Sequence, residues 1–219
     1  KTTINNRNRY FLRGQLLFEP NSDVSFRLIG DYTHRDERCC GATYVDNTVN
    51  PYVGNLNEVA SPLSTGSLPP ATGNNIINVL RDLGQPIGSF NDPFSRNTFV
   101  TRGRTYNGKT KDGGLSLEVN WDMGGATLTS ITGYRYYKNS QASDTDYSAV
   151  DILYRADNTD AQFRQFKTFT QELRLQGEAF DGKLDWLVGG YFADEDLTVR
   201  DNLRFGNDYG TFASCRLSL

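Results

Sequence analysis

Hydrophobic and polar residues alternate along several long segments of the chain. In "TFTQELRLQG" (168–177) every second side chain of an extended strand lies on the same face. One face is mostly apolar, with Phe169, Gln171, Leu173 and Leu175. The other is polar, with Thr168, Thr170, Glu172, Arg174 and Gln176. A soluble, half-buried strand has the same pattern, so this segment alone indicates a β-strand and leaves its surroundings open.

Five further segments show a related pattern, and together the six predict an all-β chain. The clearest is "LSLEVNWD", in which Leu115, Leu117, Val119 and Trp121 alternate with polar residues. In "ATLTSITGYRYY" the pattern is weaker, because Ile131 is out of phase. Strands of this length are unusual in soluble proteins, where about 5–6 residues is typical. The predicted strands cover residues 8–19, 23–36, 113–122, 126–138, 163–177 and 183–199.

The connections between these strands alternate between short and long. Turn-forming residues in "EPNSD", "DMGG" and "GEAFDG" join the strands into three hairpins, whereas long loops cover about 37–112 and 139–162. In an antiparallel up-and-down meander, all short turns then lie at one end and all long loops at the other. This asymmetry is typical of an outer-membrane barrel, with short periplasmic turns and long extracellular loops. We therefore predict a partial transmembrane β-barrel.

Aromatic residues near both ends of the strands agree with this prediction. Phe18, Trp121 and Trp186 precede or follow the short turns. Tyr32, Tyr134 and Tyr136 lie toward the long loops. Two such rows are what the aromatic girdles of a membrane barrel require, although aromatic residues are also common in strands generally.

Four phrases of the sequence resemble TonB-dependent outer-membrane receptors: "RGQLLFEPNSDVSFRLIGDYTHRDERCCGA", "LTSITGYR", "FTQELRL" and "LDWLVGGYF". The resemblance covers most of the chain outside the loop 41–112. It implies a Gram-negative outer-membrane location and contacts with membrane lipid. It also implies an N-terminal plug domain, reached by TonB, and a small nutrient ligand such as a siderophore. The family's barrel has 22 strands, so about six strands, without plug or TonB box, predict an internal segment of the barrel. A start at Lys1 fits a segment or a processed chain.

Composition narrows the alternatives further. The 219 residues include 37% hydrophobic and 12% aromatic residues, enough for a packed structure. A formal net charge of −3 argues against a nucleic-acid-binding surface. The longest strongly apolar stretch, "WLVGGYFA" at 186–193, is far shorter than the ~20 residues of a membrane-spanning helix.

Candidate residues for chemistry are few. His34 is the single histidine and is expected at the outer end of a strand, and no nucleotide-binding or nucleophile motif is present. The acidic groups Asp144/Asp146 and Asp194/Glu195/Asp196 fit solvated loops better than a calcium site. Gly113-Gly114, Gly124-Gly125 and Gly189-Gly190 are interpreted as turn or strand-adjusting glycines. The sequence thus predicts no enzyme activity, cofactor or metal, and it identifies no ligand-binding residues.

Three cysteines leave the disulfide pairing open. Cys39 or Cys40 could bridge to Cys215, or to a cysteine outside this chain, since both places would be extracellular.

The long loop also contains one helical pattern. In "NIINVLRDLG", Ile76, Ile77, Leu80 and Leu83 recur at helical spacing, with Asn74 or Asn75 as a cap and Gly84 as a stop. Structured long loops are often functional, so ligand recognition is predicted in the loops. A soluble all-β module that binds a ligand or a carbohydrate is the alternative to a transport receptor. It would be expected to have shorter strands and loops of mixed length at both ends.

Overall fold

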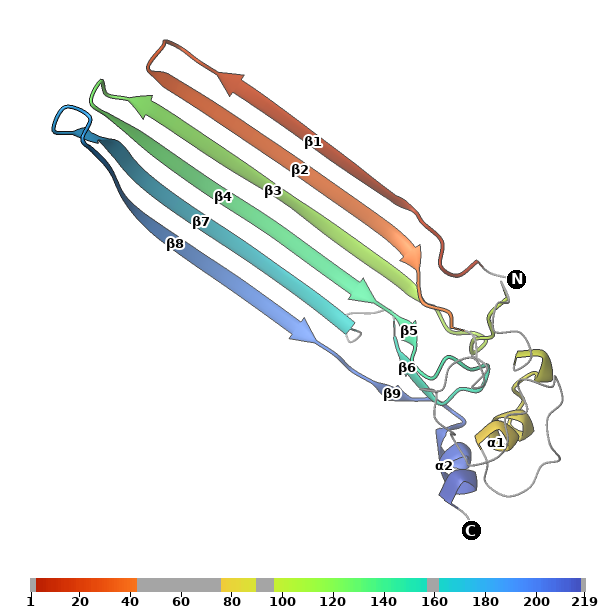
Figure 1. Cartoon of the computed structure of the whole chain (residues 1–219). Coiled ribbons are helices and arrows are strands. Elements are labelled where there is room, and N and C mark those ends of the chain that lie inside the picture. The colour runs from red at the N-terminus through yellow and green to blue at the C-terminus, as the bar shows by residue number, and fades with distance from the viewer. Residues whose placement is uncertain (1–2, 43–75, 90–96, 157–161, 218–219) are drawn as a thin grey trace.

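Six long strands form one antiparallel sheet in the computed structural model, which describes residues 3–42, 76–89, 97–156 and 162–217 (Figure 1). The strands follow one another in sequence order across the sheet, which confirms the predicted meander. They are β1 (Arg9–Phe18), β2 (Val24–Arg38), β3 (Asn107–Asp122), β4 (Ala126–Gln141), β7 (Gln162–Ala179) and β8 (Leu184–Arg200).

Short turns and long connections lie at opposite ends of this sheet. The turns at 19–23, 123–125 and 180–183 share one end, and both termini lie toward the other (Figure 1). Local chemistry explains two of the turns. The side-chain oxygen of Asn21 accepts the backbone N–H groups of Asp23 and Val24, at 3.0 and 2.9 Å. Gly124 adopts a φ of +82°, which favours glycine, and its N–H donates to Asp122.

The strand register sorts the side chains into an apolar and a polar face. Leu28 is paired with Leu16 on one side and Leu117 on the other, and Tyr134 is paired with Leu115 and Phe169. The polar face has Asp31, Glu118 and Arg174 at the intervening positions. The predicted alternation is confirmed on β3, β4 and β7, with Ile131 on the polar face, where it pairs with Glu118 and Glu172. It is weaker on β8, where Asp194 lies on the apolar face and Val199 on the polar face.

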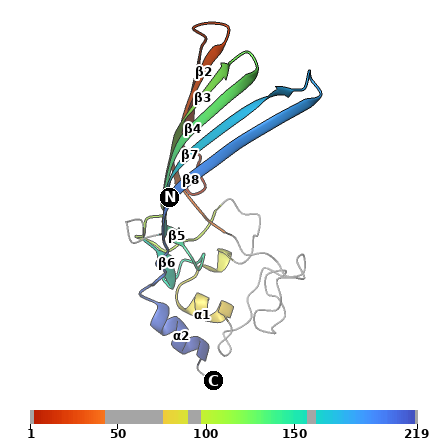
Figure 2. The same ribbon diagram turned by 90° about the vertical axis from the view of Figure 1, so that its left-hand side faces the viewer.

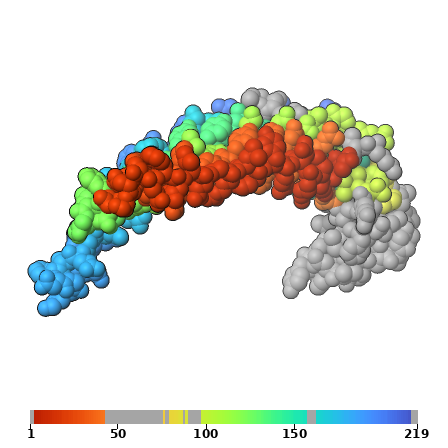
Figure 3. All heavy atoms as spheres, turned by 90° about the horizontal axis from the view of Figure 1, so that it is seen from above, coloured from red at the N-terminus to blue at the C-terminus, as the bar shows by residue number. Residues whose placement is uncertain are grey.

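No second layer of described residues covers the apolar face. Leu115 is 60% exposed, Trp121 48% and Val188 66%. Among the described residues, every buried hydrophobic side chain lies outside the six long strands. The sheet is open, because β1 and β8 each pair with one neighbour. The hairpins fan out in the view of Figure 2, although the strands stay paired up to the short turns, and seen from above the molecule is arched (Figure 3).

Three strands extend further toward the long connections than predicted. β3 begins at Asn107 instead of 113, β4 continues to Gln141 and β2 to Arg38. These extensions pair with one another. Arg38 of β2 is opposite Asn107 of β3, and Gly108 of β3 is opposite Gln141 of β4. Their sequences are polar on both faces, so hydrophobic alternation gave no signal, and backbone hydrogen bonding alone continues the ladder.

The connections expected only as long loops carry structure of their own, and so does the segment after β8. We call residues 76–89, 97–106, 142–156 and 201–217 the loop cluster. It contains a small sheet of β5 (Ser143–Asp144), β6 (Leu153–Arg155) and β9 (Arg204–Phe205). It also contains α1 (Ile76–Asp82), the 3₁₀ turn η1 (Ile87–Ser89) and α2 (Tyr209–Leu217). Leu80, Val150 and Ile152 form its buried core, against which Tyr209 and Phe212 pack.

The predicted helix is present as α1. Leu80 faces the core, and Gly84 ends the helix with a φ of +104°. The N–H of Gln85 donates to the carbonyl of Leu80, and that of Gly84 donates to Arg81, which is the Schellman arrangement. The proposed caps Asn74 and Asn75 lie outside the described residues, as do 43–73 and 90–96 of the long loop.

Candidate functional site

An ion pair between Arg104 and Asp151 joins separate segments of the loop cluster. The guanidinium donates from Nε and Nη2 to the two carboxylate oxygens, at 2.7 and 2.6 Å. It also stacks over the ring of Tyr154, with Cζ 3.4 Å from the ring centroid. The N–H of Asn207 donates to the same carboxylate at 2.9 Å. These donors, Arg104 foremost, hold the pKa of Asp151 below its usual range.

A second carboxylate of the loop cluster, that of Asp144, is buried. Its side chain accepts the backbone N–H groups of Thr101 and Tyr147 at 3.2 and 2.9 Å. Burial is the main reason that the pKa of Asp144 is raised to about 6, and the charge of Asp146 adds to the effect. Tyr106 donates its hydroxyl to the carbonyl of Thr101, and burial raises its phenol pKa.

The two acidic groups have different positions. Asp144 and Asp146 organise the backbone of the loop cluster, whereas Asp194, Glu195 and Asp196 lie within β8 and not in the expected loop. Asp146 accepts from the N–H groups of Ser148 and Leu153 at 3.0 and 2.7 Å, so it acts together with Asp144 as a turn former. In the second group, Asp194 and Asp196 lie on the face opposite to Glu195, because β8 alternates. Glu195 accepts from the hydroxyl of Thr168. Among the residues described, no group of three or more His, Cys, Asp or Glu is placed to hold a metal ion.

The polar face of the sheet carries a cross-strand charge network centred on Arg135. Its guanidinium contacts Asp112 on the adjacent β3 at 2.8 Å and Asp31 on β2, two strands away, at 3.4 Å. The intervening residue is Gly114, which pairs with both Asp31 and Arg135. A Cβ at Gly114 would lie 3.4 Å from the Arg135 guanidinium. The glycine therefore leaves the space that Arg135 uses to cross the strand.

The remaining candidates have structural positions. His34 lies on the apolar face of β2, toward the long connections, with its ring 5.4 Å from that of Tyr10. Gly113-Gly114 and Gly189-Gly190 lie within β3 and β8, and Gly124-Gly125 lies in a turn, as interpreted from the sequence.

Cys39 and Cys40 are bonded to each other, so the suggested bridge from either one to Cys215 is wrong. Cys39 and Cys40 directly follow β2, whereas Cys215 is in α2.

Sequence reasoning missed the Arg104–Asp151 pair and its contact with Asn207. The partners are 47 and 56 residues apart, and neither belongs to a motif. The loop cluster joins four segments, so only their folding brings these polar groups together. These hydrogen bonds hold the loops in position around a small hydrophobic core.

Comparison with known proteins gives no match, whether with protein-family models, curated proteins or solved structures. None of the described helices combines the length and the hydropathy needed to cross a membrane.

Proposed function

We propose that this chain forms part of the wall of an outer-membrane β-barrel receptor that takes up a scarce nutrient with energy delivered through TonB. The observation that carries the proposal is the uncovered apolar face. Six strands of 10 to 18 residues expose large apolar side chains along one side. Between the tyrosines and the short turns, the charged side chains lie on the other side, apart from Asp194, which is opposite Phe169. A soluble protein buries such a face against a second layer. A lipid bilayer covers it instead.

The length of the apolar band agrees with a membrane location. We use this name for the part of the apolar face between the tyrosines and the short turns. On β3 the band runs from Gly113, beside Tyr32 and Tyr136, to Trp121. Nine residues at ~3.4 Å each span about 30 Å along the strand, and tilt reduces this toward the ~25 Å apolar height of an outer-membrane barrel. Beyond the tyrosines, the same face carries Lys109 and Lys111. In this proposal the tyrosines lie at the outer interface, and Arg135 and its partners face the barrel interior.

The open sheet edges also fit a segment of a larger barrel. β1 and β8 each have an edge that pairs with no described strand, over 10 and 17 residues. Long, unprotected edges promote aggregation, and closed barrels avoid them. The plug, and TonB acting through it, belong to the proposed whole receptor.

The loop cluster is the proposed recognition surface. The strands are committed to lipid on one side and the interior on the other, so only the long connections are free to meet an external ligand. A rigid core under these connections lowers the ordering cost of binding. The nutrient class stays open among iron chelates, cobalamin, sugars and similar compounds.

Uptake assays test this proposal. Cells that express the full-length protein would be compared with cells that lack it, or that lack TonB, using a panel of radiolabelled chelates, cobalamin and oligosaccharides. We expect one compound whose accumulation disappears in both deletion strains. A full-length protein that is monodisperse in buffer without detergent would contradict the proposal and favour the soluble binding module.

A further inference from the structure

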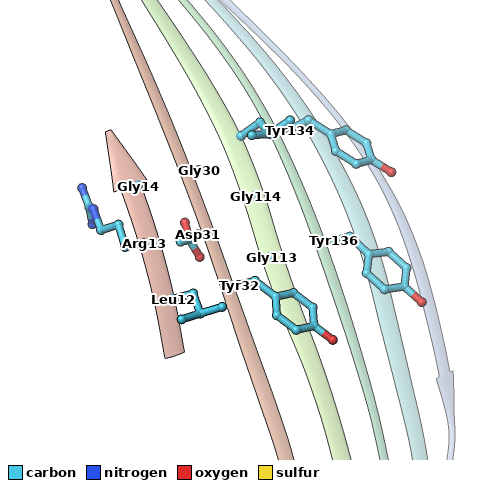
Figure 4. Close-up of a pocket in the computed structure, with 11 residues that line it drawn as sticks. Leu12, Arg13, Gly14, Gly30, Asp31, Tyr32, Gly113, Gly114, Tyr134 and Tyr136 are labelled. Atoms are coloured by element: carbon cyan, nitrogen blue, oxygen red, sulfur yellow. The ribbon is translucent and has the colours of Figure 1, made fainter. Parts of the chain in front are cut away.

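The apolar face has a hollow near the outer end of the sheet, where glycines replace large side chains. Gly14, Gly30 and Gly113, on three adjacent strands, form its floor. Apolar and aromatic side chains surround it: Leu12, Tyr32, Leu115, Tyr134 and Tyr136. In Figure 4 the three tyrosines point to one side of the sheet and Arg13 points to the other. The hollow therefore opens on the apolar face.

The glycine floor is what makes room in this hollow. A Cβ built on Gly14 would meet no atom within 4 Å. A Cβ on Gly30 would lie 3.1 Å from the side chain of Leu115, and one on Gly113 would lie 3.2 Å from the ring of Tyr32, so these two side chains already lie over their glycines. The open space of the hollow is therefore above Gly14. The result is an apolar groove bordered by aromatic rings, a shape that suits a hydrocarbon chain.

Three lysines lie immediately beyond the hollow on the same face. Lys111 is two residues from Gly113 on β3 and directly opposite Lys138 on β4. Lys167 on β7 is opposite Tyr136 and therefore diagonal to Lys138. All three side chains are exposed. Directly opposed like charges on neighbouring strands destabilise a sheet, with Cβ atoms about 5 Å apart.

Nothing in the described part of the chain neutralises these charges by a close ion pair. Lys109 has such a pair, with Asp36 at 3.9 Å, and Lys138 lies 5.5 Å from the ring of Phe163. Asp196 is opposite Lys167 in register, but the two form no ion pair. An anion bound between Lys111 and Lys138, with Lys167 at its side, would relieve the repulsion of the directly opposed pair.

We propose that this face binds a phosphate-bearing membrane lipid, with its headgroup on Lys111, Lys138 and Lys167 and one acyl chain in the glycine-floored hollow. The inference rests on the proposed membrane location. It adds a specific lipid site at the outer interface. Two independent features point to one amphiphile: the lysine cluster matches an anionic headgroup, and the adjoining groove matches an acyl chain. Their separation of two residues on β3, about 7 Å, suits a single lipid molecule.

Lipid binding to the full-length protein tests the site. The purified protein, in micelles of a neutral detergent, would be titrated with phosphatidic acid or with phosphatidylcholine, and bound lipid counted by native mass spectrometry. We expect at least about tenfold preference for phosphatidic acid. Each Lys→Gln change at 111, 138 or 167 should weaken binding about fivefold, as expected for one basic residue at a membrane surface. Lys183→Gln, in the turn at the opposite end of the sheet, is the matched control and should have no effect.

Filling the groove tests the acyl-chain half of the proposal. Gly14→Leu should weaken phosphatidic acid binding at least about threefold by occupying the hollow, since a side chain there meets no neighbour. Gly190→Leu is the control, because it is on the same face, is equally open, and lies outside the hollow. Equal losses in both glycine variants would overturn the assignment.

Two other results would also overturn the lipid site. One is equal binding of the two lipids by the unmodified protein. The other is displacement of phosphatidic acid by millimolar inorganic phosphate, which would indicate a free-anion site. A protein that needs detergent but binds both lipids equally would refute only this inference. A protein that is soluble without detergent would refute the membrane proposal itself.

Discussion

The six-stranded sheet and the loop cluster are stabilised in different ways. The sheet has continuous backbone pairing and no buried hydrophobic side chain in any of its long strands, whereas the smaller loop cluster encloses Leu80, Val150 and Ile152. The six-stranded sheet therefore has no hydrophobic core of its own, whereas the loop cluster has one. In the proposed account a lipid bilayer covers the apolar face of the sheet, whereas the loop cluster has a core of its own. This difference is the basis for assigning the sheet to lipid and the loop cluster to water.

The largest expected effect comes from emptying the core of the loop cluster. Leu80 is 5% exposed, so Leu80→Ala should cost about 2–5 kcal/mol of local stability through lost burial and a cavity. Amide hydrogen exchange at 150–153 measures it. Leu16→Ala on the sheet, where the side chain is 63% exposed, is the matched control and should leave exchange in the loop cluster unchanged. Similar exchange in both variants would remove the distinction between the two regions.

A charge on the apolar face should be nearly as costly in the membrane. Leu117 is near the middle of the band, so Leu117→Arg should destabilise the folded protein in lipid vesicles by about 2–4 kcal/mol. The adjacent Ser116→Arg places the same charge on the polar face, opposite Gly133, and should cost far less. Urea titration of the full-length protein in vesicles compares them. If Ser116→Arg were the more destabilising variant, the assignment of the lipid-facing and interior faces would have to be reversed.

Alternation and turn chemistry were sufficient to predict the sheet. Strongly patterned segments such as 115–121 define strand faces, and Gly124 or Asn21 identifies a turn from local chemistry alone. The loop cluster could be predicted only at α1, where helical spacing and Gly84 are local signals. β5, β6 and β9 have two or three residues each, too few for a periodic pattern. The Arg104–Asp151 pair depends on contacts between distant segments, which no local pattern records.

Removal of the half-buried Arg104 cation should destabilise the loop cluster by less than the Leu80→Ala change. Arg104→Met retains most of the side-chain volume but leaves the Asp151 carboxylate without its two charged hydrogen bonds, at a cost of about 1.5–3 kcal/mol. Arg155→Met is the control, because its partner Asp201 is more exposed and such pairs contribute about 1 kcal/mol or less. Hydrogen exchange at 204–208 distinguishes the two. A larger effect from Arg155→Met would contradict the role given to Arg104.

Asp144 should also make the stability of the loop cluster depend on pH. Its pKa is raised to about 6 in the folded protein, so the folded state binds a proton that the unfolded state has released. This contribution to stability is fully present below about pH 4, the unfolded pKa, and is lost as the pH rises through 6. Hydrogen exchange at 99–103 and 142–148, corrected for its intrinsic pH dependence, should show this loss of stability as faster exchange above pH 6. Asp144→Asn should remove that slope, and an unchanged slope would assign it to another group.

The central claim is that the apolar face of the sheet contacts lipid, and site-directed accessibility along β3 tests it most directly. Single cysteines would replace residues 115 to 121 in turn, in a full-length protein without Cys39, Cys40 and Cys215, reconstituted in vesicles and spin-labelled. The account predicts that labels at 115, 117, 119 and 121 are accessible to a lipid-soluble relaxant. It predicts that labels at 116, 118 and 120 are accessible to a water-soluble one. Uniform accessibility to the water-soluble relaxant at all seven positions would contradict it.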